Sequence, residues 1–241
     1  MSISSDGLLC SWALDMLTKP QDSHDLAKVG IKSDDIAITT FDFQDKEATT
    51  FLIGTEEGVA YQANRFERAG SKSGVNKNEA YKAHTGPITG LQFHPSSGQF
   101  DFSDLFLTSS VDWSVKLWRY RDQQRTTGSA VQPLRSFDDF GDYVLDVAWS
   151  PSHPAVFSAV DAEGRYTLWN LNAETEVPVK VTNVGNKGLN KIRWSKDGTK
   201  NAIASSDGNV YVYDTGDLAT AKPHDWEKFH QTISEFGSSS L

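Results

Sequence analysis

Disulfides, secretion signals and membrane spans are what this sequence of 241 residues most clearly lacks. It has a single cysteine, Cys10, so no disulfide can form within the chain. No stretch approaches the roughly 18 consecutive apolar residues of a transmembrane helix, and the N-terminus has neither the basic start nor the apolar core of a signal peptide. No Asn-x-Ser/Thr acceptor for glycosylation occurs. These absences predict a reducing, intracellular compartment and no membrane insertion.

An excess of basic residues is lacking as well. The 23 Lys and Arg residues are outnumbered by 32 Asp and Glu residues, which gives a formal net charge of −9. A domain that grips nucleic acid is usually basic, because it must neutralise phosphate groups. We therefore expect no direct binding of nucleic acid.

Recognisable catalytic and ligand-binding motifs are also absent from the sequence. There is no Gly-x4-Gly-Lys-Ser/Thr phosphate-binding loop, and the segment Gly70–Gly74 has Lys72 where a nucleophile elbow needs serine. The six histidines do not have the spacing of metal ligands, and one cysteine cannot build a thiolate zinc site. The sequence therefore predicts no catalytic residue, no metal site and no cofactor, and hence a protein that is not an enzyme.

What the sequence does contain is a repeated phrase: small residues, an acidic residue, a turn, and an alternating strand that ends in an aromatic residue. The acidic residue precedes the aromatic residue by 6 positions in four copies: Asp6 and Trp12, Asp112 and Trp118, Glu163 and Trp169, Asp207 and Tyr213. Glu57 marks a weaker copy, and successive acidic residues are 51, 55, 51 and 44 positions apart. The shortest of these spacings equals the repeat length of about 40–45 residues in WD40 proteins, and the longer ones leave room for loop insertions.

Each copy is predicted to contain four strands. A strand with period-two alternation and a short apolar strand precede each turn, and a weaker outer strand follows the aromatic residue. One such sheet cannot bury both of its faces, whereas sheets stacked face to face can. The prediction is an all-β fold, an incomplete WD40 β-propeller of about four and a half blades with a short C-terminal helix. A β-sandwich is the alternative, but it gives no reason for turns with a fixed offset.

The repeat also predicts where the blades begin and end. Residues 1–222 are expected to form the blades: a partial blade at 1–33 and full blades at 34–82, 83–137, 138–182 and 186–222. Because the chain starts in the middle of a blade, we expect it to be the C-terminal part of a larger ring.

Helical spacing replaces the strand pattern after the last blade. In residues 223–236, four apolar residues lie on one face of a helix: Trp226, Phe229, Ile233 and Phe236. Asp225 is the predicted N-cap. Residues 237–241 are expected to form a frayed tail.

His84 lies 28 residues before Asp112 and is the candidate for a buried structural network. In WD40 blades a histidine at this distance before the turn forms a hydrogen bond with a serine or threonine. That hydroxyl group in turn bonds the acidic residue of the turn and the aromatic residue of the next strand. Thr108 and Ser110 are the candidates for the middle position, and Trp118 is the aromatic residue. Each bond would contribute about 1 kcal/mol. The remaining acidic and aromatic residues of the repeat are predicted to be structural too: Asp6, Trp12, Glu163, Trp169, Asp207 and Tyr213.

Exposed aromatic residues among charges form the candidate surface for a protein partner. Trp113 directly follows the turn residue Asp112 and should project at the rim of its blade. The neighbouring segment 137–143 and the helix supply the other candidates: Asp139, Phe140, Asp142, Tyr143, Trp226 and Phe229. Partial burial under neighbouring loops is the alternative. The basic segment Arg65–Ala80 is predicted to be a solvated insertion, with a docking site as its alternative.

Beyond the fold, the residues resemble the cytoplasmic dynein intermediate chains over nearly the whole sequence. The segments that carry the resemblance are Asp6–Leu17, His84–Gly90, Ser109–Trp118, Tyr143–Phe157, Leu168–Pro178, Leu189–Trp194 and Asp225–Phe229. The resemblance implies a non-catalytic, cytoplasmic and microtubule-associated subunit whose propeller docks on the tail of the dynein heavy chain, beside other subunits of the complex. It also implies that the region that binds light chains and dynactin lies upstream and is not present here.

A WD40 adaptor of another complex is the alternative function. It could be the substrate receptor of a ubiquitin ligase or part of a trafficking coat. The segments named above favour the dynein subunit, and an upstream helical segment with light-chain motifs would discriminate between the two.

Overall fold

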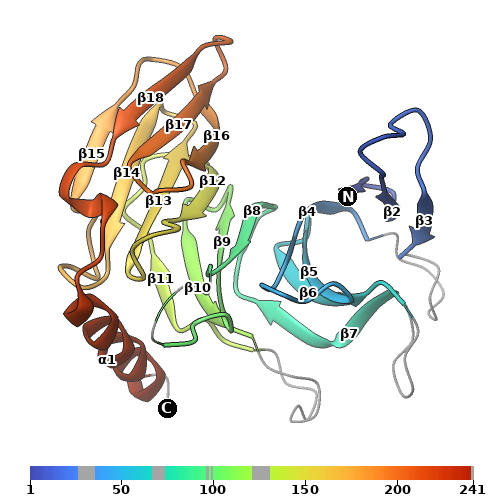
Figure 1. The fold of residues 1–241 in the computed structure, drawn as a ribbon, viewed down its shortest axis with the longest axis horizontal. Helices are drawn as coiled ribbons and strands as arrows, with labels where there is room; N and C mark the ends of the chain where they lie inside the picture. Colours follow the sequence, from blue (N-terminus) through green and yellow to red (C-terminus); the bar gives the residue numbers. More distant parts are fainter. Residues whose placement is uncertain (27–35, 67–73, 96–97, 99, 121–130, 240–241) are drawn as a thin grey trace.

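Five antiparallel sheets follow one another along the chain in the computed structural model, which describes residues 1–26, 36–66, 74–95, 98, 100–120 and 131–239 (Figure 1). The first sheet contains β1 (Ser2–Ile3), β2 (Leu8–Ser11) and β3 (Asp22–Asp25). The second contains β4 (Ile38–Phe43), β5 (Thr50–Thr55), β6 (Val59–Asn64) and β7 (Gly74–Lys82), and the third contains β8 (Ile88–Phe93), β9 (Leu105–Ser110), β10 (Val115–Arg119) and β11 (Arg135–Phe137). The fourth contains β12 (Val144–Trp149), β13 (Val156–Asp161), β14 (Arg165–Asn170) and β15 (Lys180–Asn183), and the fifth contains β16 (Leu189–Trp194), β17 (Lys200–Ser205) and β18 (Val210–Asp214).

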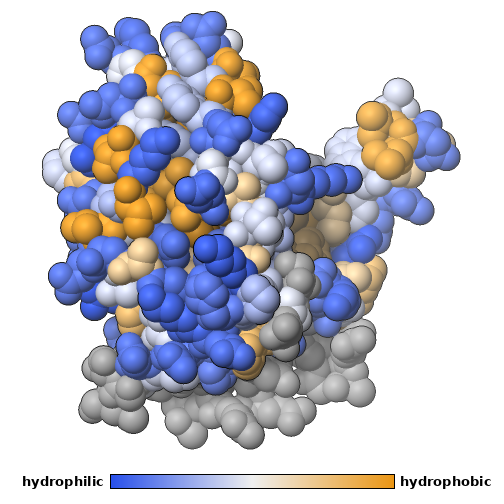
Figure 2. Space-filling model, turned by 60° about the vertical axis from the view of Figure 1, so that its left-hand side comes forward, coloured by the Kyte–Doolittle hydropathy of each residue, from blue (hydrophilic) through white to orange (hydrophobic). Residues whose placement is uncertain are grey.

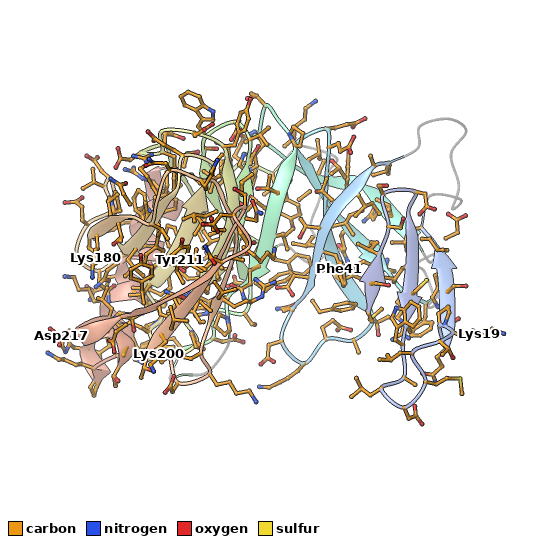
Figure 3. The ribbon with its side chains drawn as sticks, turned by 90° about the horizontal axis from the view of Figure 1, so that it is seen from above. Lys19, Phe41, Lys180, Lys200, Tyr211 and Asp217 are labelled. Atoms are coloured by element: carbon orange, nitrogen blue, oxygen red, sulfur yellow. The ribbon has the colours of Figure 1, made fainter. Side chains whose placement is uncertain are left out.

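The sheets are arranged along an arc. Their first strands β4, β8, β12 and β16 lie next to one another, so that each sheet fans outward from this inner row (Figure 1). Lys19, in the loop between β2 and β3, and Asp217, beyond the fifth sheet, lie at opposite sides of the molecule, so the ends of the arc do not meet (Figure 3). The structure thus shows a stack of antiparallel sheets but not a closed ring.

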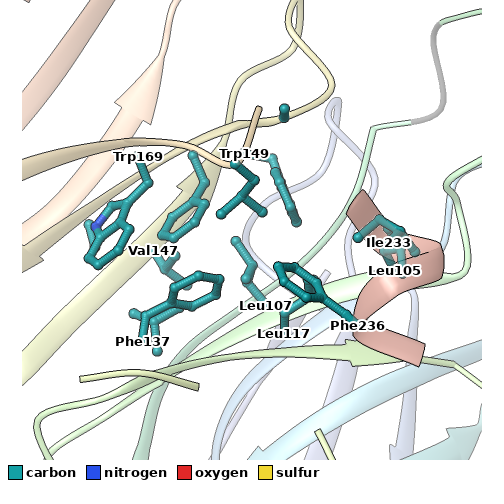
Figure 4. Close-up of a cluster of buried hydrophobic side chains, with 14 of the residues drawn as sticks. Leu105, Leu107, Leu117, Phe137, Val147, Trp149, Trp169, Ile233 and Phe236 are labelled. Atoms are coloured by element: carbon teal, nitrogen blue, oxygen red, sulfur yellow. The ribbon is translucent and has the colours of Figure 1, made fainter. Parts of the chain in front are cut away.

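A separate hydrophobic cluster fills each of the four spaces between successive sheets. The largest lies between the third and fourth sheets and includes Leu107, Trp149 and Trp169 (Figure 4). Alternation within the strands supplies these clusters, because every second side chain of a strand points to the same face of its sheet. A sheet between two others therefore buries both of its faces.

The repeated aromatic residue at the end of the third strand contacts the preceding sheet. The rings of Trp118 and Tyr81 are 5.8 Å apart, those of Trp169 and Phe137 are 5.1 Å apart, and those of Tyr213 and Tyr166 are 5.6 Å apart. Buried aromatic pairs of this kind add about 0.5–1.5 kcal/mol beyond the area they bury. The fixed spacing in the sequence therefore serves the packing of one sheet on the next.

Side chains of the inner strands also bond to the backbone of the following sheet. Asp42 Oδ2 accepts a hydrogen bond from the Phe93 amide at 2.8 Å, and Gln92 Oε1 accepts one from the Trp149 amide at 2.6 Å. Asp146 Oδ2 accepts one from the Ile192 amide at 3.0 Å. Three successive junctions are thus held by the same kind of bond.

Glycine is required where two of the turns meet the loop of the next sheet. Gly58 has φ +77°, and a Cβ there would lie 2.7 Å from the carbonyl oxygen of Gly86. Gly164 has φ +99°, and a Cβ there would lie 2.6 Å from the carbonyl oxygen of Gly185. Both positions need the left-handed backbone and the missing side chain that only glycine provides.

Helix α1 (Pro223–Ser239) packs on the third and fourth sheets, at the ends of β8 and β12 that lie away from the Asp112 turn (Figure 1). Its predicted apolar face is turned inward, and Phe229, Ile233 and Phe236 are buried. The helix is longer than predicted, since residues 237–239 are helical where a frayed tail was expected. Asp225 lies within the first turn, where its carboxylate accepts a hydrogen bond from the Lys222 amide at 2.7 Å, so it is not the N-cap.

Two strand predictions also differ from the structure. The segment predicted as a solvated insertion at 65–80 ends in β7 from Gly74 onward, because this strand pairs with β6 to complete the second sheet; its residues 67–73 lie outside the described part. The unit at 186–222 was expected to be a full blade but has three strands in the described structure, followed by a short 3-10 helix (Gly216–Ala219) and α1. None of the helices among the described residues is long and apolar enough to cross a membrane.

Candidate interaction site and its supporting network

One face of the sheet stack is formed by turns and loops that alternate from sheet to sheet. In the second to fifth sheets, the turn between the second and third strands donates an amide hydrogen bond to the carbonyl of the residue just before that sheet's inner strand. The pairs are Glu56 with Ala37, Val111 with Pro87, Ala162 with Tyr143, and Ser206 with Gly188, at 2.9–3.2 Å. We call the turns 56–58, 111–114, 162–164 and 206–208, with the loops 83–87, 138–143 and 184–188, the turn face.

A buried network supports the turn face in the third sheet. His84 Nδ1 lies 2.8 Å from Asp112 Oδ2, and His84 Nε2 lies 2.7 Å from Thr108 Oγ1. Trp118 Nε1 donates to Thr108 Oγ1 at 2.8 Å. Because a carboxylate only accepts, the neutral His84 ring carries its proton on Nδ1, and the bonds run in one direction from Trp118 through Thr108 and His84 to Asp112.

Protonation within this network follows from burial and bonding. Burial lowers the pKa of His84, against the opposing effect of Asp112. Burial alone would raise the pKa of Asp112, but hydrogen bonds from His84, Ser114 and Thr85 hold it well below its usual range. Asp112 Oδ1 also accepts from Ser114 Oγ and from the Ser114 amide, at 2.6 and 3.1 Å. The turn 111–114 is therefore held by a charged and nearly fully bonded carboxylate.

Ser110, the other candidate for the middle position, has a different role. Its hydroxyl donates to the Gly86 carbonyl at 2.9 Å and accepts from the Asp112 amide at 3.2 Å. Ser110 therefore ties the loop before β8 to the turn, whereas Thr108 carries the link between His84 and Trp118.

The other acidic residues of the repeat are not joined to their aromatic partners by such a chain in the described structure. Asp6 Oδ1 accepts from the Leu8 amide, and Trp12, half-exposed, donates to Ser2 Oγ. Asp207 is exposed and accepts from Asn209 and from the Tyr211 hydroxyl. These carboxylates shape their own turns, while Tyr213 packs on Tyr166 and Trp12 is bonded to Ser2.

In the fourth sheet the carboxylate that holds the turn is Asp161 rather than Glu163. Asp161 is fully buried and accepts from the Arg165 amide and from Arg165 Nε at 2.8 and 2.9 Å. Glu163 is exposed and lies 3.5 Å from Arg165 Nε. Trp169 Nε1 donates to Thr167 Oγ1 at 3.2 Å, so no histidine is needed. In the sequence, the ion pair between Asp161 and Arg165 is indicated only by the spacing of four residues between them.

The predicted partner surface divides into exposed and buried residues. Trp113 and Tyr143 are exposed, with relative solvent-accessible areas of 48% and 49%. Asp139 is exposed as well, whereas Asp142 is half-buried. Phe140 and Phe229 were placed on this surface wrongly, because both are buried in the cluster between the third and fourth sheets. Trp226 is half-buried against Phe102, at a ring separation of 6.2 Å, so α1 uses its apolar face within the molecule.

Apolar side chains are also exposed at two places away from the turn face. One place comprises β15, the segment just before it, and β18, with the exposed residues Val177, Val179, Val181, Val210 and Val212. The other is the hairpin of the first sheet, with the exposed residues Leu14, Met16 and Leu17. Hydrophobic side chains gather on the body of the molecule and on a projecting arm in the space-filling view (Figure 2).

Metal binding finds no support in the described part of the chain. No group of three or more His, Cys, Asp or Glu side chains there could hold a metal ion.

Comparison with known proteins connects these features to a family. The family model for the WD domain, G-beta repeat, matches residues 76–119, which include His84, Asp112 and Trp118. The chain is 46% identical over 237 residues to the cytoplasmic dynein 1 intermediate chain of Drosophila melanogaster. It is a homologue of the dynein intermediate chains. The similarity covers 98% of this chain and confirms the resemblance in the sequence, and the chain spans about a third of the relative's length, 34%.

Proposed function

We propose that this chain is the WD40 part of a non-catalytic intermediate-chain subunit of the cytoplasmic dynein motor, and that it binds the tail of the dynein heavy chain. The observation that carries the proposal is the identity of 46% across 98% of the chain. The relative's name places that protein in a dynein complex. The complex would put the protein in the cytoplasm, associated with microtubules, together with the other dynein subunits.

The proposal includes a propeller architecture for the five sheets. Sheets that fan outward from a row of inner strands, each buried by its neighbours, are arranged as blades are. The fixed aromatic residues also support blades, since Trp118, Trp169 and Tyr213 each contact the preceding sheet. Contacts with light chains and dynactin are assigned to residues outside this chain.

Reconstitution tests the function directly. The full-length protein that contains this chain is mixed with the heavy-chain tail, and the mixture is separated by size-exclusion chromatography with light scattering. We expect a stable complex, which is lost when the segment corresponding to residues 1–239 is deleted. A folded full-length protein that elutes apart from the heavy chain would overturn the proposal.

A further inference from the structure

Trp113 is an exposed aromatic residue on a turn that is held rigidly. Its φ of +67° lies in the left-handed region, which is uncommon for any residue other than glycine. The residues on either side keep it there, because Asp112 bonds both Ser114 and the buried His84. An aromatic side chain on a fixed backbone loses little conformational freedom when it meets a partner.

A second exposed aromatic residue and two acidic residues accompany Trp113. Val115 pairs with Phe137, and this register places Asp138 and Asp139 beside the turn that carries Trp113. The loop then continues to the exposed Tyr143, whose carbonyl oxygen is bonded to the next turn. The buried Phe140 anchors the middle of this loop against Trp169, at a ring separation of 5.9 Å.

The charge around these aromatic residues is mainly negative. Arg165, the residue after the turn 162–164, is the cation beside the loop 138–143, and its guanidinium is paired with Asp161 and Glu163. The turn face as defined above has Lys187 as its one lysine and has no arginine. Its carboxylates are those of Glu56, Glu57, Asp112, Asp138, Asp139, Asp142, Glu163 and Asp207. Asp207 remains ionised well into the acid range, because hydrogen bonds from Asn209, Ser205 and Tyr211 lower its pKa to about 2. The field over Trp113 and Tyr143 therefore attracts cationic side chains.

We propose that Trp113 and Tyr143, with Asp138 and Asp139, form the docking surface for a lysine- and arginine-bearing segment of the partner protein. The cationic groups lie over the aromatic rings and pair with the carboxylates beside them, while their aliphatic stems cover the apolar rings. The chemistry rests on charge complementarity, since an acidic surface of this size repels an acidic segment. The inference rests on the proposed function. It places the heavy-chain contact on the turn face and predicts that the contacting segment of the heavy chain is positively charged.

Photo-crosslinking within the reconstituted complex identifies the occupant. The full-length protein carries p-benzoylphenylalanine at Trp113, and a control carries it at Val181, which is exposed on the outer strand β15. We expect position 113, and not position 181, to crosslink to a heavy-chain peptide with a net positive charge. Crosslinks from position 113 to an acidic or neutral heavy-chain peptide, to the same chain or to a second copy would overturn the inference, as would no crosslink in an intact complex.

Affinity measurements give an independent readout. Trp113→Asn keeps the left-handed turn, which asparagine tolerates, and removes the ring; Asp139→Lys reverses one charge. We expect each to weaken heavy-chain binding by about 10-fold or more, as central aromatic and charged contacts do, and the wild-type affinity to fall as salt rises. Glu227→Lys on the exposed face of α1 makes the same charge change at the other end of the sheets and should leave binding unchanged.

The two proposals fail in different ways. Unchanged affinity of Trp113→Asn and Asp139→Lys in a complex that still forms would overturn the docking surface and leave the dynein assignment standing. A wild-type protein that forms no complex would overturn the proposed function and the docking surface together.

Discussion

The hydroxyl group of Thr108 holds two parts of the third sheet together, although it is a single small group. It accepts from Trp118 Nε1 and donates to His84 Nε2, and all three side chains are buried. Valine has nearly the same shape but no hydroxyl, so it would leave a buried indole N–H and an imidazole nitrogen without partners. Such groups are costly because neither water nor protein replaces the lost bond.

Thr108→Val should therefore destabilise the third sheet by about 2–4 kcal/mol. Urea unfolding of the full-length protein, followed by the fluorescence of its tryptophans, measures the change. Thr108→Ser keeps the hydroxyl and is the matched control, with an expected loss of about 1 kcal/mol for the missing methyl group. Equal stability of Thr108→Val and the wild type would show that the network contributes nothing.

Residues that recur at fixed spacing were predictable from the sequence, whereas residues whose role depends on a neighbour were not. The six-residue offset located the turns and aromatic residues, and His84 was recognised from its distance to Asp112. Asp146 was missed, because a bond from one carboxylate to a backbone amide 46 residues away leaves no periodic signal. Asp161 was missed, because the six-residue offset pointed to Glu163 instead. Phe140 and Phe229 were assigned to the surface because burial of an aromatic residue depends on which element covers it.

The attachment of helix α1 is expected to depend on pH, because two buried histidines lie beneath it. The helix covers His94, whose ring stacks on Phe229 at 5.9 Å and whose Nε2 donates to the Pro154 carbonyl. Burial lowers the pKa of His94 to about 4. Burial also lowers the pKa of His153, although Asp225 of the helix lies 3.4 Å away and opposes the shift. Docking of the helix therefore favours the neutral form of both histidines.

Acid should release α1 before it unfolds the sheets. When the helix detaches, the histidines become exposed and regain a pKa near 6.5, so the detached state binds more protons and docking weakens as the pH falls from about 6.5 to about 4. For His94 the loss is about 2 kcal/mol at pH 5. Hydrogen exchange of residues 223–239, corrected for the intrinsic pH dependence, should show faster opening at pH 5 than at pH 7.

His94→Gln is the control for this effect. Glutamine can still donate a hydrogen bond to the Pro154 carbonyl but does not titrate, so the pH dependence of α1 opening should become shallower. Opening of α1 that is independent of pH in the wild type would contradict the assignment of these histidines.

At the scale of the whole molecule, stability is a sum of junctions between neighbouring sheets. Asp146 is the centre of the junction between the fourth and fifth sheets, because its buried carboxylate binds the Ile192 amide, Lys191 Nζ and Arg193 Nη1. Sheets that contact only their neighbours can open one at a time. Loss of one junction should therefore loosen the sheet beyond it and leave the others in place.

Asp146→Ala should increase hydrogen exchange in β16, β17 and β18 by at least 10-fold without changing exchange in the second sheet. The expected local loss is about 2–4 kcal/mol, since a buried, charged acceptor is removed from three donors. Asp146→Asn keeps the acceptor for the Ile192 amide and should recover part of the loss. Uniform exchange changes across all sheets would show that the molecule opens as one unit.

The bonds between successive sheets also set the order in which the protein can assemble during synthesis. Each acceptor leaves the ribosome before its donor: Asp42 precedes Phe93 by 51 residues, Gln92 precedes Trp149 by 57, and Asp146 precedes Ile192 by 46. A nascent chain can thus add one sheet at a time onto a surface that is already folded. Helix α1 is translated after all five sheets and reaches back to His94, so its docking marks the completion of translation for this part of the chain.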